Sequence, residues 1–327
     1  MKVLIAAYSD VAAWCIPEAQ VARLRREFPA HTFVRADSDA ETIARIADVE
    51  VALGARLKPA HLAAARRLRW IHSPAAGVGN MLFPDMIASP VTLTNSRGSS
   101  SATIAEHVIA VTLALLRRLP RASRRQAEHV WAQNEFEAGP SIRTLRGARV
   151  LIVGLGSIGG EAGALAAAFG AVVVGIRRGA DGPRPGGVSS VVTPDRLHDE
   201  LPLADVVVLA APQTAATAHL IGAPELALMM DDAVLVNVGR GSLVDEEALV
   251  RALEAGRLRG AALDVFEREP LPPGHPLWAR EDVLVTPHVS GFHAGHWDGV
   301  VGIFADNLRR FAAGEPLLNA VDKGAGY

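Results

Sequence analysis

The chain has few of the features that mark extracellular, membrane-bound or nucleic-acid-binding proteins. Among its 327 residues there is a single cysteine, Cys15, so no disulfide can form within the chain, and a reducing compartment is expected. The formal net charge of −2 gives no broad basic surface for nucleic acid or membranes. The apolar stretch Ile104–Leu116 is too short to span a bilayer and contains Glu106 and His107. Because Met1–Ala7 resembles a strand rather than a targeting leader, we expect a soluble, cytoplasmic protein.

The chain is rich in apolar sequence, and this sequence alternates between two patterns. Hydrophobic residues make up 50% of the chain, and its length suggests about two domains. In the first part, strand-like and helix-like runs alternate, which indicates a parallel sheet covered on both faces. The spacing from Ser38 to Glu41 fits a capping box and predicts a helix start. The expected strands are Val3–Tyr8, His31–Arg35, Glu50–Gly54, Leu68–His72 and Val91–Thr94, and the expected helices are Glu18–Phe28, Asp39–Ile46 and Pro59–Leu68.

The rest of the chain repeats this alternation after a long helical region. A helix is expected over Thr103–Arg118, with a capping box from Thr103 to Glu106, and a helical pattern resumes over Arg121–Trp131. A final helix over Gly291–Ala313 could return to the first domain. The expected strands between them are Ala148–Val153, Ala171–Ile176, Asp205–Ala210, Ala233–Asn237, Gly260–Leu263 and Val283–Thr286.

The stretch Gly154-Leu155-Gly156-Ser157-Ile158-Gly159 carries the clearest functional signal. It follows an apolar strand, opens an Ala-rich helix and precedes a second strand, which is the context that indicates dinucleotide binding. The first glycine permits a tight turn, the second lets a pyrophosphate approach the backbone, and the third lets the helix pack on the strand. The helix start then offers free N–H groups and a positive dipole end to phosphates.

Arg240, Glu269 and His288 each follow one of the last three expected strands. Ligands of open α/β sheets bind outside the carboxyl ends of strands. Taken singly, these residues have ordinary structural explanations: a surface arginine, a loop carboxylate and a hydrogen-bonded histidine. Together, beside a dinucleotide site, they indicate an active site.

With these motifs in place, the sequence resembles the D-isomer-specific 2-hydroxyacid dehydrogenases. The resemblance covers nearly the whole chain, and it implies two Rossmann-like or flavodoxin-like parallel-sheet domains. Residues 1–100 and 288–327 would form a split substrate domain, and residues 101–287 an inserted NAD(P)-binding domain. The segments that carry the resemblance, besides the glycine motif, are Ser73–Val78, Ala105–His107, Val236–Gly241, Asp264–Pro270 and Pro287–Gly291.

The resemblance also implies roles for single residues. His288 would be the general acid/base, Glu269 its carboxylate partner and Arg240 the substrate anchor. The chemistry agrees, because histidine titrates near neutrality and a carboxylate favours its charged form. The backbone N–H groups expected to hold the substrate carboxylate are those of Ala76, Gly77 and Val78. The cofactor contacts expected from the motif and the resemblance together are Thr103, Gly154, Gly156, Ser157, Ile158, Gly159, Arg177, Arg178, Ala211, Pro212, Thr217, Val238, Gly239, Arg240, Asp264, His288 and Gly291, and no metal site is expected.

The activity implied is hydride transfer between NADP(H) and a small 2-oxo or D-2-hydroxy acid, as in glyoxylate or hydroxypyruvate reductases. Two alternatives stay open. One is oxidation of a phosphorylated D-hydroxy acid, as in phosphoglycerate dehydrogenases, and the other is a nucleotide-sensing corepressor without turnover. Relatives that act on formate carry glutamine in place of the carboxylate partner, so Glu269 argues against that activity. Where the family often has arginine, this chain has Ala218, which puts cofactor contacts there in doubt. A homodimer is implied, formed largely by the nucleotide domains.

The residues after the strand Ala171–Ile176 predict the choice of cofactor. NAD-preferring enzymes place an acid at this strand end to bind the ribose 2′-hydroxyl. Here the strand is followed by Arg177 and Arg178, which could bind a 2′-phosphate, and the next acid, Asp181, is expected to lie too far along the loop. NADP is therefore expected, with NAD possible. The alternative is a pair of solvated arginines.

Overall fold

The structure, a computed structural model, describes residues 1–179 and 182–326, so Asp181 lies outside the described residues. The chain divides into two compact units. The first consists of Met1–Ser100 together with Phe292–Tyr327, and the second of Ser101–Gly291. The second unit is therefore inserted into the first along the chain.

In the described part of the first unit, five parallel strands form one sheet in the order β2-β1-β3-β4-β5. The strand order reverses between β1 and β3, which is the kind of switch point where open sheets bind ligands. The strands are β1 (Lys2–Ala6), β2 (Thr32–Arg35), β3 (Val51–Gly54), β4 (Trp70–Ser73) and β5 (Thr92–Asn95), and the helices are α1 (Glu18–Glu27), α2 (Asp39–Arg45), α3 (Pro59–Ala64), α4 (Pro84–Ala88) and α12 (His296–Ala313).

Both faces of the central strands β1 and β3 are buried, which explains why these two strands are almost entirely apolar. In β1, Val3 and Ile5 contribute to the core on one face, and Leu4 and Ala6 to the core on the other. The first of these cores also contains residues of α1 and α12. The capping box that starts α2 is confirmed, because the Ser38 side chain accepts a hydrogen bond from the Glu41 N–H at 3.2 Å.

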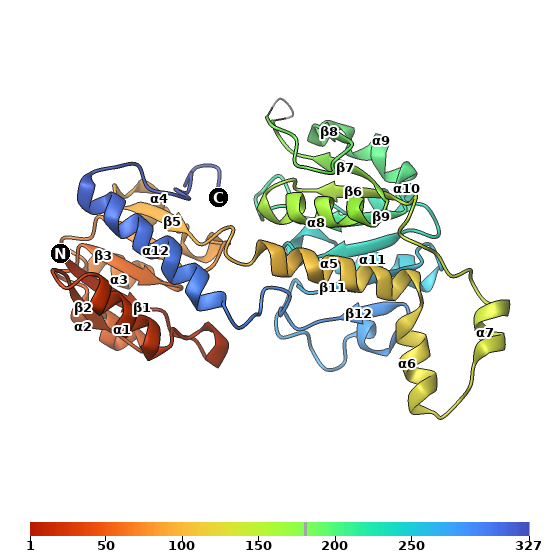
Figure 1. The fold of residues 1–327 in the computed structure, drawn as a ribbon, viewed down its shortest axis with the longest axis horizontal. Helices are drawn as coiled ribbons and strands as arrows, with labels where there is room; N and C mark the ends of the chain where they lie inside the picture. Colours follow the sequence, from red (N-terminus) through yellow and green to blue (C-terminus); the bar gives the residue numbers. More distant parts are fainter. Residues whose placement is uncertain (180–181, 327) are drawn as a thin grey trace. The chain divides into compact units, whose positions relative to one another are not determined.

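The last helix, α12, brings the end of the chain back to the first sheet (Figure 1). Val300, Phe304 and Leu308 recur at helical spacing and are fully buried in the same core as β1. The helix begins at His296, later than the expected start at Gly291. Residues 291–295, which precede the helix, therefore form a loop.

Within residues 101–179 and 182–291, seven parallel strands form a sheet in the order β12-β11-β10-β9-β6-β7-β8. The order reverses between β6 and β9, so the switch point lies at the ends of these two strands. The expected α/β class, with a parallel sheet in each unit, is confirmed. The strands are β6 (Arg149–Val153), β7 (Val172–Ile176), β8 (Ser190–Val192), β9 (Val206–Leu209), β10 (Val234–Asn237), β11 (Gly260–Leu263) and β12 (Val283–Val285), and the helices are α5 (Ser101–Leu116), α6 (Leu119–Ala127), α7 (Gln133–Ala138), α8 (Ser157–Ala168), α9 (Leu197–Glu200), α10 (Ala223–Leu228) and α11 (Glu246–Glu254).

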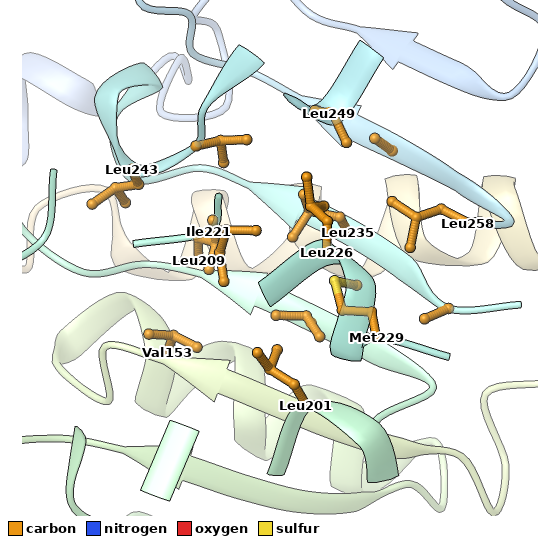
Figure 2. Packing of buried hydrophobic residues seen from close by; sticks show 14 of the residues in the cluster. Val153, Leu201, Leu209, Ile221, Leu226, Met229, Leu235, Leu243, Leu249 and Leu258 are labelled. Carbon is orange, nitrogen blue, oxygen red and sulfur yellow. The ribbon is translucent and has the colours of Figure 1, made fainter. Parts of the chain in front are cut away.

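The strands of the second sheet also bury both faces. Figure 2 shows the core on one face, where Leu209 and Leu235 of the sheet meet Leu226 and Leu249 of α10 and α11. On the opposite face, the alternate strand positions pack against α5 and α8, which lie side by side (Figure 1). The two-sided covering holds the strand ends, and the loops after them, in fixed positions.

The region around α5 differs from expectation at its ends. The helix begins at Ser101, so the spacing from Thr103 to Glu106 does not mark its start. The helical pattern over Arg121–Trp131 corresponds to α6, which has no buried residue. In Figure 1, α6 and α7 stand away from the sheet of the second unit. No helix within the described residues is long and apolar enough to cross a membrane.

Candidate active site

The glycine motif occupies the switch point of the second sheet. Gly154 follows β6 with a φ of +100°, and a Cβ at this residue would come within 2.4 Å of the backbone nitrogen of Ala211. A Cβ on Gly159 would lie 2.3 Å from the carbonyl oxygen of Gly154. Only glycine therefore allows the turn at Gly154 and the close packing of α8 at Gly159.

Gly156, by contrast, faces open space, because a Cβ built there meets nothing within 4 Å. It is the N-cap residue of the twelve-residue helix α8, and no side chain caps this end. The first N–H groups of a helix have no partner within the helix. The backbone at Gly156, Ser157 and Ile158 therefore offers donors beside unfilled space, as a bound phosphate requires.

The two arginines after β7 differ in their surroundings. Arg177 is half-buried, and its guanidinium donates to the carbonyl oxygens of Gly182 and Pro183. Arg178 is exposed. Arg177 thus holds the loop after the strand, and Arg178 is the more exposed residue of the two.

The loop after β9 is closed by Thr217. Its hydroxyl donates to the carbonyl oxygen of Pro212 at 2.8 Å and accepts from the N–H of Thr214 at 2.8 Å. Ala211 is buried beside the glycine turn. The loop thus has a defined shape next to the switch point, although arginine is missing at Ala218.

The turn after β10 sets the position of Arg240. The buried Asn237 side chain donates to the carbonyl oxygen of Arg240 at 2.9 Å and accepts from the N–H of Gly239 at 3.0 Å. Gly239 also has no room for a side chain, since its Cβ would meet Leu243 at 2.7 Å. Sequence reasoning missed Asn237 as a positioning residue.

Gly241 joins this turn to the loop that carries Glu269. A Cβ at Gly241 would lie 1.8 Å from the carbonyl carbon of Phe266, so the two backbones are in direct contact. Burial lowers the pKa of the Arg240 guanidinium, and the negative charge of Glu269 opposes this shift. The close approach therefore places a cation and a carboxylate on neighbouring loops. Sequence reasoning missed Gly241 as well, because its partner lies far along the chain.

Glu269 and His288 form a hydrogen-bonded pair. The His288 Nδ1 lies 2.7 Å from the Glu269 Oε2, while the Glu269 Oε1 accepts the N–H of Phe266 at 3.0 Å. Partial burial alone would raise the pKa of the Glu269 carboxyl, but these two hydrogen bonds, together with the charges of His288 and Arg240, outweigh it, and the pKa is lowered. Glu269 is therefore anionic at neutral pH. With Nδ1 directed to the carboxylate, the other ring nitrogen of His288 remains for a reacting group.

The backbone around His288 is held by the buried Asp264. One carboxylate oxygen accepts from the Val289 N–H at 2.9 Å and the Thr286 hydroxyl at 2.6 Å, and the other accepts from the Ser290 N–H at 3.0 Å. His288 itself has a φ of 54°, which is uncommon for a residue with a side chain. Asp264 thus fixes the backbone on both sides of His288 and so sets the position of its ring.

The other residues singled out in the sequence lie at separate places in the second unit. Thr103 is half-buried in the first turn of α5, and Gly291 is half-buried at the end of the unit. Val238 is buried in the turn between Asn237 and Gly239. His107, in a segment that carried the resemblance, lies 3.3 Å from the Thr286 hydroxyl through its Nε2.

The loop expected to hold the substrate carboxylate belongs to the first unit. It follows β4, at the carboxyl edge of that sheet. The N–H groups of Ala76, Gly77 and Val78 make no hydrogen bond to any described residue. Three consecutive amides without such a partner are suited to an anion.

Comparisons with known proteins agree with these features. The sequence model described as "D-isomer specific 2-hydroxyacid dehydrogenase, NAD binding domain" matches residues 109–290. D-3-phosphoglycerate dehydrogenase of Archaeoglobus fulgidus is 32% identical over 260 residues, which cover 79% of this chain and 48% of that protein. Glyoxylate reductase of Aeropyrum pernix is 34% identical over 267 residues, covering 80% of this chain and 78% of that protein.

The fold as a whole also has a solved counterpart. A D-isomer specific 2-hydroxyacid dehydrogenase from Xanthobacter autotrophicus, in complex with NADPH and MES, superposes with a TM-score of 0.86 at 31% identity. The match covers 100% of this chain and 99% of that one. The chain spans about half the length of the phosphoglycerate dehydrogenases it matches. From the matched domain, the relatives more than 30% identical and the shared fold, it follows that the chain belongs to the D-isomer specific 2-hydroxyacid dehydrogenase family.

Proposed function

We propose that this protein is an NADP(H)-dependent reductase of a small 2-oxo acid such as glyoxylate or hydroxypyruvate. The observation that carries the proposal is the pair of Glu269 and His288, joined at 2.7 Å at the strand ends of the unit that also contains the glycine turn. A proton-transfer pair and a dinucleotide-binding turn are the two requirements of a nicotinamide-dependent dehydrogenase.

The residues present fit a dinucleotide. The first and third glycines leave no room for a side chain, while Gly156 faces open space at the uncapped start of α8. These features place unpaired N–H groups where a pyrophosphate can approach the backbone. The turn from Gly154 to Gly159 would hold the phosphates, with Ala211, Pro212 and Thr217 on the neighbouring loop.

When bound, NADPH supplies the hydride that reduces the substrate carbonyl carbon. His288 holds a proton on its Nε2 and gives it to the carbonyl oxygen, which becomes the hydroxyl of the product. Glu269 fixes the ring through Nδ1 and stabilises its protonated form. In the reverse direction, the same nitrogen takes the proton from the hydroxyl.

Two groups bind the substrate in this proposal. The Arg240 guanidinium is held by a 2.6 Å hydrogen bond to the Gly239 carbonyl, and its rigid fork suits a carboxylate and the adjacent carbonyl. The amides of Ala76, Gly77 and Val78 donate to the same carboxylate. A 2-oxo acid carries a carboxylate and a carbonyl on adjacent carbons, which is why this substrate class is favoured.

The preference for NADP(H) is supported by the strand end at Arg177 and Arg178. Neither position can accept a hydrogen bond from a ribose 2′-hydroxyl, whereas a 2′-phosphate suits both guanidinium groups. The relative from Xanthobacter autotrophicus is in complex with NADPH. NAD(H) remains a second, weaker cofactor in this proposal.

The function is tested with a panel of 2-oxo acids against NADPH and NADH, followed by absorbance at the nicotinamide band. We expect turnover of glyoxylate or hydroxypyruvate, and higher kcat/KM with NADPH. A second candidate is oxidation of a phosphorylated D-hydroxy acid, which is favoured by the similarity to phosphoglycerate dehydrogenases. The panel therefore includes D-3-phosphoglycerate with both oxidised cofactors. Cofactor binding without turnover of any acid would instead indicate a nucleotide sensor.

The remaining features of the proposal concern organisation. Residues 1–100 and 288–327 serve as the substrate domain, and residues 101–287 as the NAD(P)-binding domain. We propose a homodimer formed by the second units, supported by the exposed α6 and α7, and a cytoplasmic location, supported by the free thiol of the single cysteine.

A further inference from the structure

The loop after β4 is bonded to the end of β5 through carbonyl groups. The carbonyl oxygen of Ser73 accepts from the Ser96 hydroxyl at 2.9 Å, and that of Ala75 accepts from the Ser96 N–H at 3.3 Å. The carbonyl oxygen of Ala76 accepts from the Asn95 side-chain amide at 2.7 Å. All three bonds come from the end of β5 and the residue after it, so the neighbouring strand fixes this loop.

The N–H groups of this loop, unlike its carbonyls, are mostly without a hydrogen-bond partner among the described residues. The Ala75 N–H donates to the Ser73 hydroxyl at 3.2 Å, but those of Ala76, Gly77 and Val78 have no acceptor among the described residues. The carbonyls of Ser73, Ala75 and Ala76 are thus bonded to the neighbouring strand, whereas the N–H groups of residues 76–78 make no hydrogen bond to the described residues.

A chain of buried side chains extends from the Ser96 anchor into the sheet. The Trp70 indole N–H donates to the Thr94 hydroxyl at 2.8 Å, the Thr94 hydroxyl lies 2.7 Å from Nδ1 of His72, and Nε2 of His72 lies 3.0 Å from the Ser96 hydroxyl. These four residues are at most 1% exposed. The indole can only donate, and the Ser73 carbonyl can only accept. The hydroxyl of Ser96 therefore donates to Ser73 and accepts from His72.

This direction of the hydrogen bonds requires one tautomer of His72. His72 must carry its proton on Nε2 and accept from Thr94 at Nδ1. Burial lowers the pKa of His72 to about 3, so the ring is neutral at physiological pH. A neutral ring with a single tautomer transmits the same hydrogen-bond direction at all times, which keeps the Ser96 hydroxyl aimed at the loop.

We propose that His72, Asn95 and Ser96 are positioning residues, which hold the amides of residues 76–78 open toward the substrate carboxylate. The inference rests on the proposed function, because it assumes that this loop binds the carboxylate of a 2-oxo acid. It adds a buried network on β4 and β5 that determines how well the carboxylate is held. None of the three side chains needs to touch the substrate.

The first test compares Asn95→Ala with Asn307→Ala. Asn307 is a matched control, because it is also buried in the first unit and also bonds to a backbone carbonyl and N–H, both of Leu318. We expect Asn95→Ala to raise KM for the 2-oxo acid by about 10- to 100-fold, as loss of precise placement does, while the Kd for NADPH is unchanged. Asn307→Ala should leave KM unchanged. An unchanged KM in a folded Asn95→Ala, or an equal rise in both variants, overturns the proposal.

The second test concerns the histidine. His72→Gln keeps an N–H donor near the position of Nε2, whereas His72→Leu removes both ring nitrogens. We expect a higher KM in His72→Leu and substantial recovery in His72→Gln. In the parent protein, nitrogen NMR of the imidazole should show the Nε2–H tautomer only. The Nδ1–H tautomer in the parent, or a KM as high in His72→Gln as in His72→Leu, contradicts the proposed direction of the hydrogen bonds.

Binding measurements separate this proposal from the proposed function. With saturating NADPH, oxamate is titrated while the backbone N–H signals of Ala76, Gly77 and Val78 are followed by NMR. We expect these signals to shift in the parent and the oxamate Kd to rise in Asn95→Ala. Absence of turnover in the parent would refute the reductase. An oxamate Kd that is the same in the parent and in Asn95→Ala would refute the positioning role, whatever the turnover of the parent.

Discussion

His288 combines an unusual backbone with a short hydrogen bond. Its φ of 54° lies in the left-handed region, and its amide donates to the carbonyl oxygen of Asp264 at 2.9 Å. The surrounding bonds to the Asp264 carboxylate stabilise this conformation, which carries a cost for a residue with a side chain. The result is a ring whose Nδ1 meets Glu269 and whose Nε2 stays accessible. This arrangement is what proton transfer to a substrate requires.

His288→Ala should lower kcat by about 10²- to 10⁴-fold while cofactor affinity is kept, because a positioned acid/base contributes that much. The measurement is steady-state turnover together with NADPH binding. His198→Ala is a suitable control, since His198 also pairs with a carboxylate, Glu225 at 2.8 Å, in the same unit. Near-full turnover in His288→Ala would show that His288 is structural.

Glu269→Gln should lower kcat for reduction by about tenfold or more, because a neutral amide replaces the carboxylate that orients the His288 ring for proton transfer. The pKa of the Glu269 carboxyl is lowered, so the parent keeps this charge across the neutral range and loses it only as the pH falls through the lowered pKa. Steady-state kinetics at neutral pH measure the effect. Glu267→Gln is the control, as Glu267 has a similarly exposed side chain and pairs with His219. A kcat that is unchanged, or lowered equally in both variants, would contradict this.

Arg240→Lys should raise KM and lower kcat together, with kcat/KM falling roughly 10- to 100-fold, since a charge-assisted hydrogen bond is worth about 1.5–3 kcal/mol. A lysine keeps the charge but not the planar fork. The kinetics are measured for each acid in the panel, with Arg257→Lys on the surface of the same unit as control. If KM is unchanged for every acid, Arg240 does not bind the substrate.

The sequence predicted which side chains lie at the strand ends, but not what holds them there. Arg240, Glu269 and His288 could be selected because each follows an apolar run that ends a strand. Asn237 and Gly241 were missed. The contact between Gly241 and the Phe266 backbone depends on two loops meeting across neighbouring strands, and no local pattern records that meeting.

Among the elements, the apolar strands were predictable, whereas some short elements were not. Parallel strands bury both faces, so they read as continuous apolar runs. The helix α4 and the strand β8 are only five and three residues long, and they carry no comparable pattern. The start of α5 was misjudged because Thr103 and Glu106 satisfy a local rule, while the helix continues to Ser101, a buried residue. Short-range rules fail where tertiary packing decides the end of an element.

The end of β7 carries the prediction on cofactor choice. The parent should prefer NADPH at least about tenfold in kcat/KM, because each charge-assisted bond to a 2′-phosphate contributes about 1.5–3 kcal/mol. Arg177→Asp and Arg178→Asp should each weaken use of NADPH more than use of NADH. In Arg177→Asp the bonds from Arg177 to the carbonyls of the following loop are lost as well, so the two variants are compared with each other.

The control for this experiment is Arg196→Asp, which makes the same charge change at an exposed residue of the same unit. It should leave the ratio of the two cofactors unchanged. Equal kcat/KM for NADPH and NADH in the parent would refute the assignment of the 2′-phosphate to this strand end, while leaving the reductase itself intact.

At the scale of the whole molecule, α6 and α7 with the segment between them are poorly covered by their own unit. Neither helix has a buried residue. Exposed apolar side chains gather here, with Leu119 at 53%, Val130 at 45% and Trp131 at 90% exposure. Arg121 and Arg125 both bond to Glu135, so the two helices are tied to each other. We call α6, α7 and the segment between them the arm. Because its two helices are bonded to each other while its apolar side chains stay exposed, the arm suits an interface between subunits.

We therefore predict a dimer at micromolar concentration, in which Trp131 is buried by the partner. Interfaces draw much of their stability from a few aromatic anchors, so Trp131→Ser should cost about 2 kcal/mol or more and raise the dimer dissociation constant at least about tenfold. Trp278→Ser is the matched control, because Trp278 is 48% exposed in the same unit but belongs to the 3-10 helix Pro276–Ala279 and not to α6, α7 or the segment between them. Sedimentation equilibrium of the parent and both variants measures the effect. A parent that is monomeric over this range would refute the dimer. A dimer weakened equally by both substitutions would show that the arm is not its anchor, since the two tryptophans differ in position and not in chemistry.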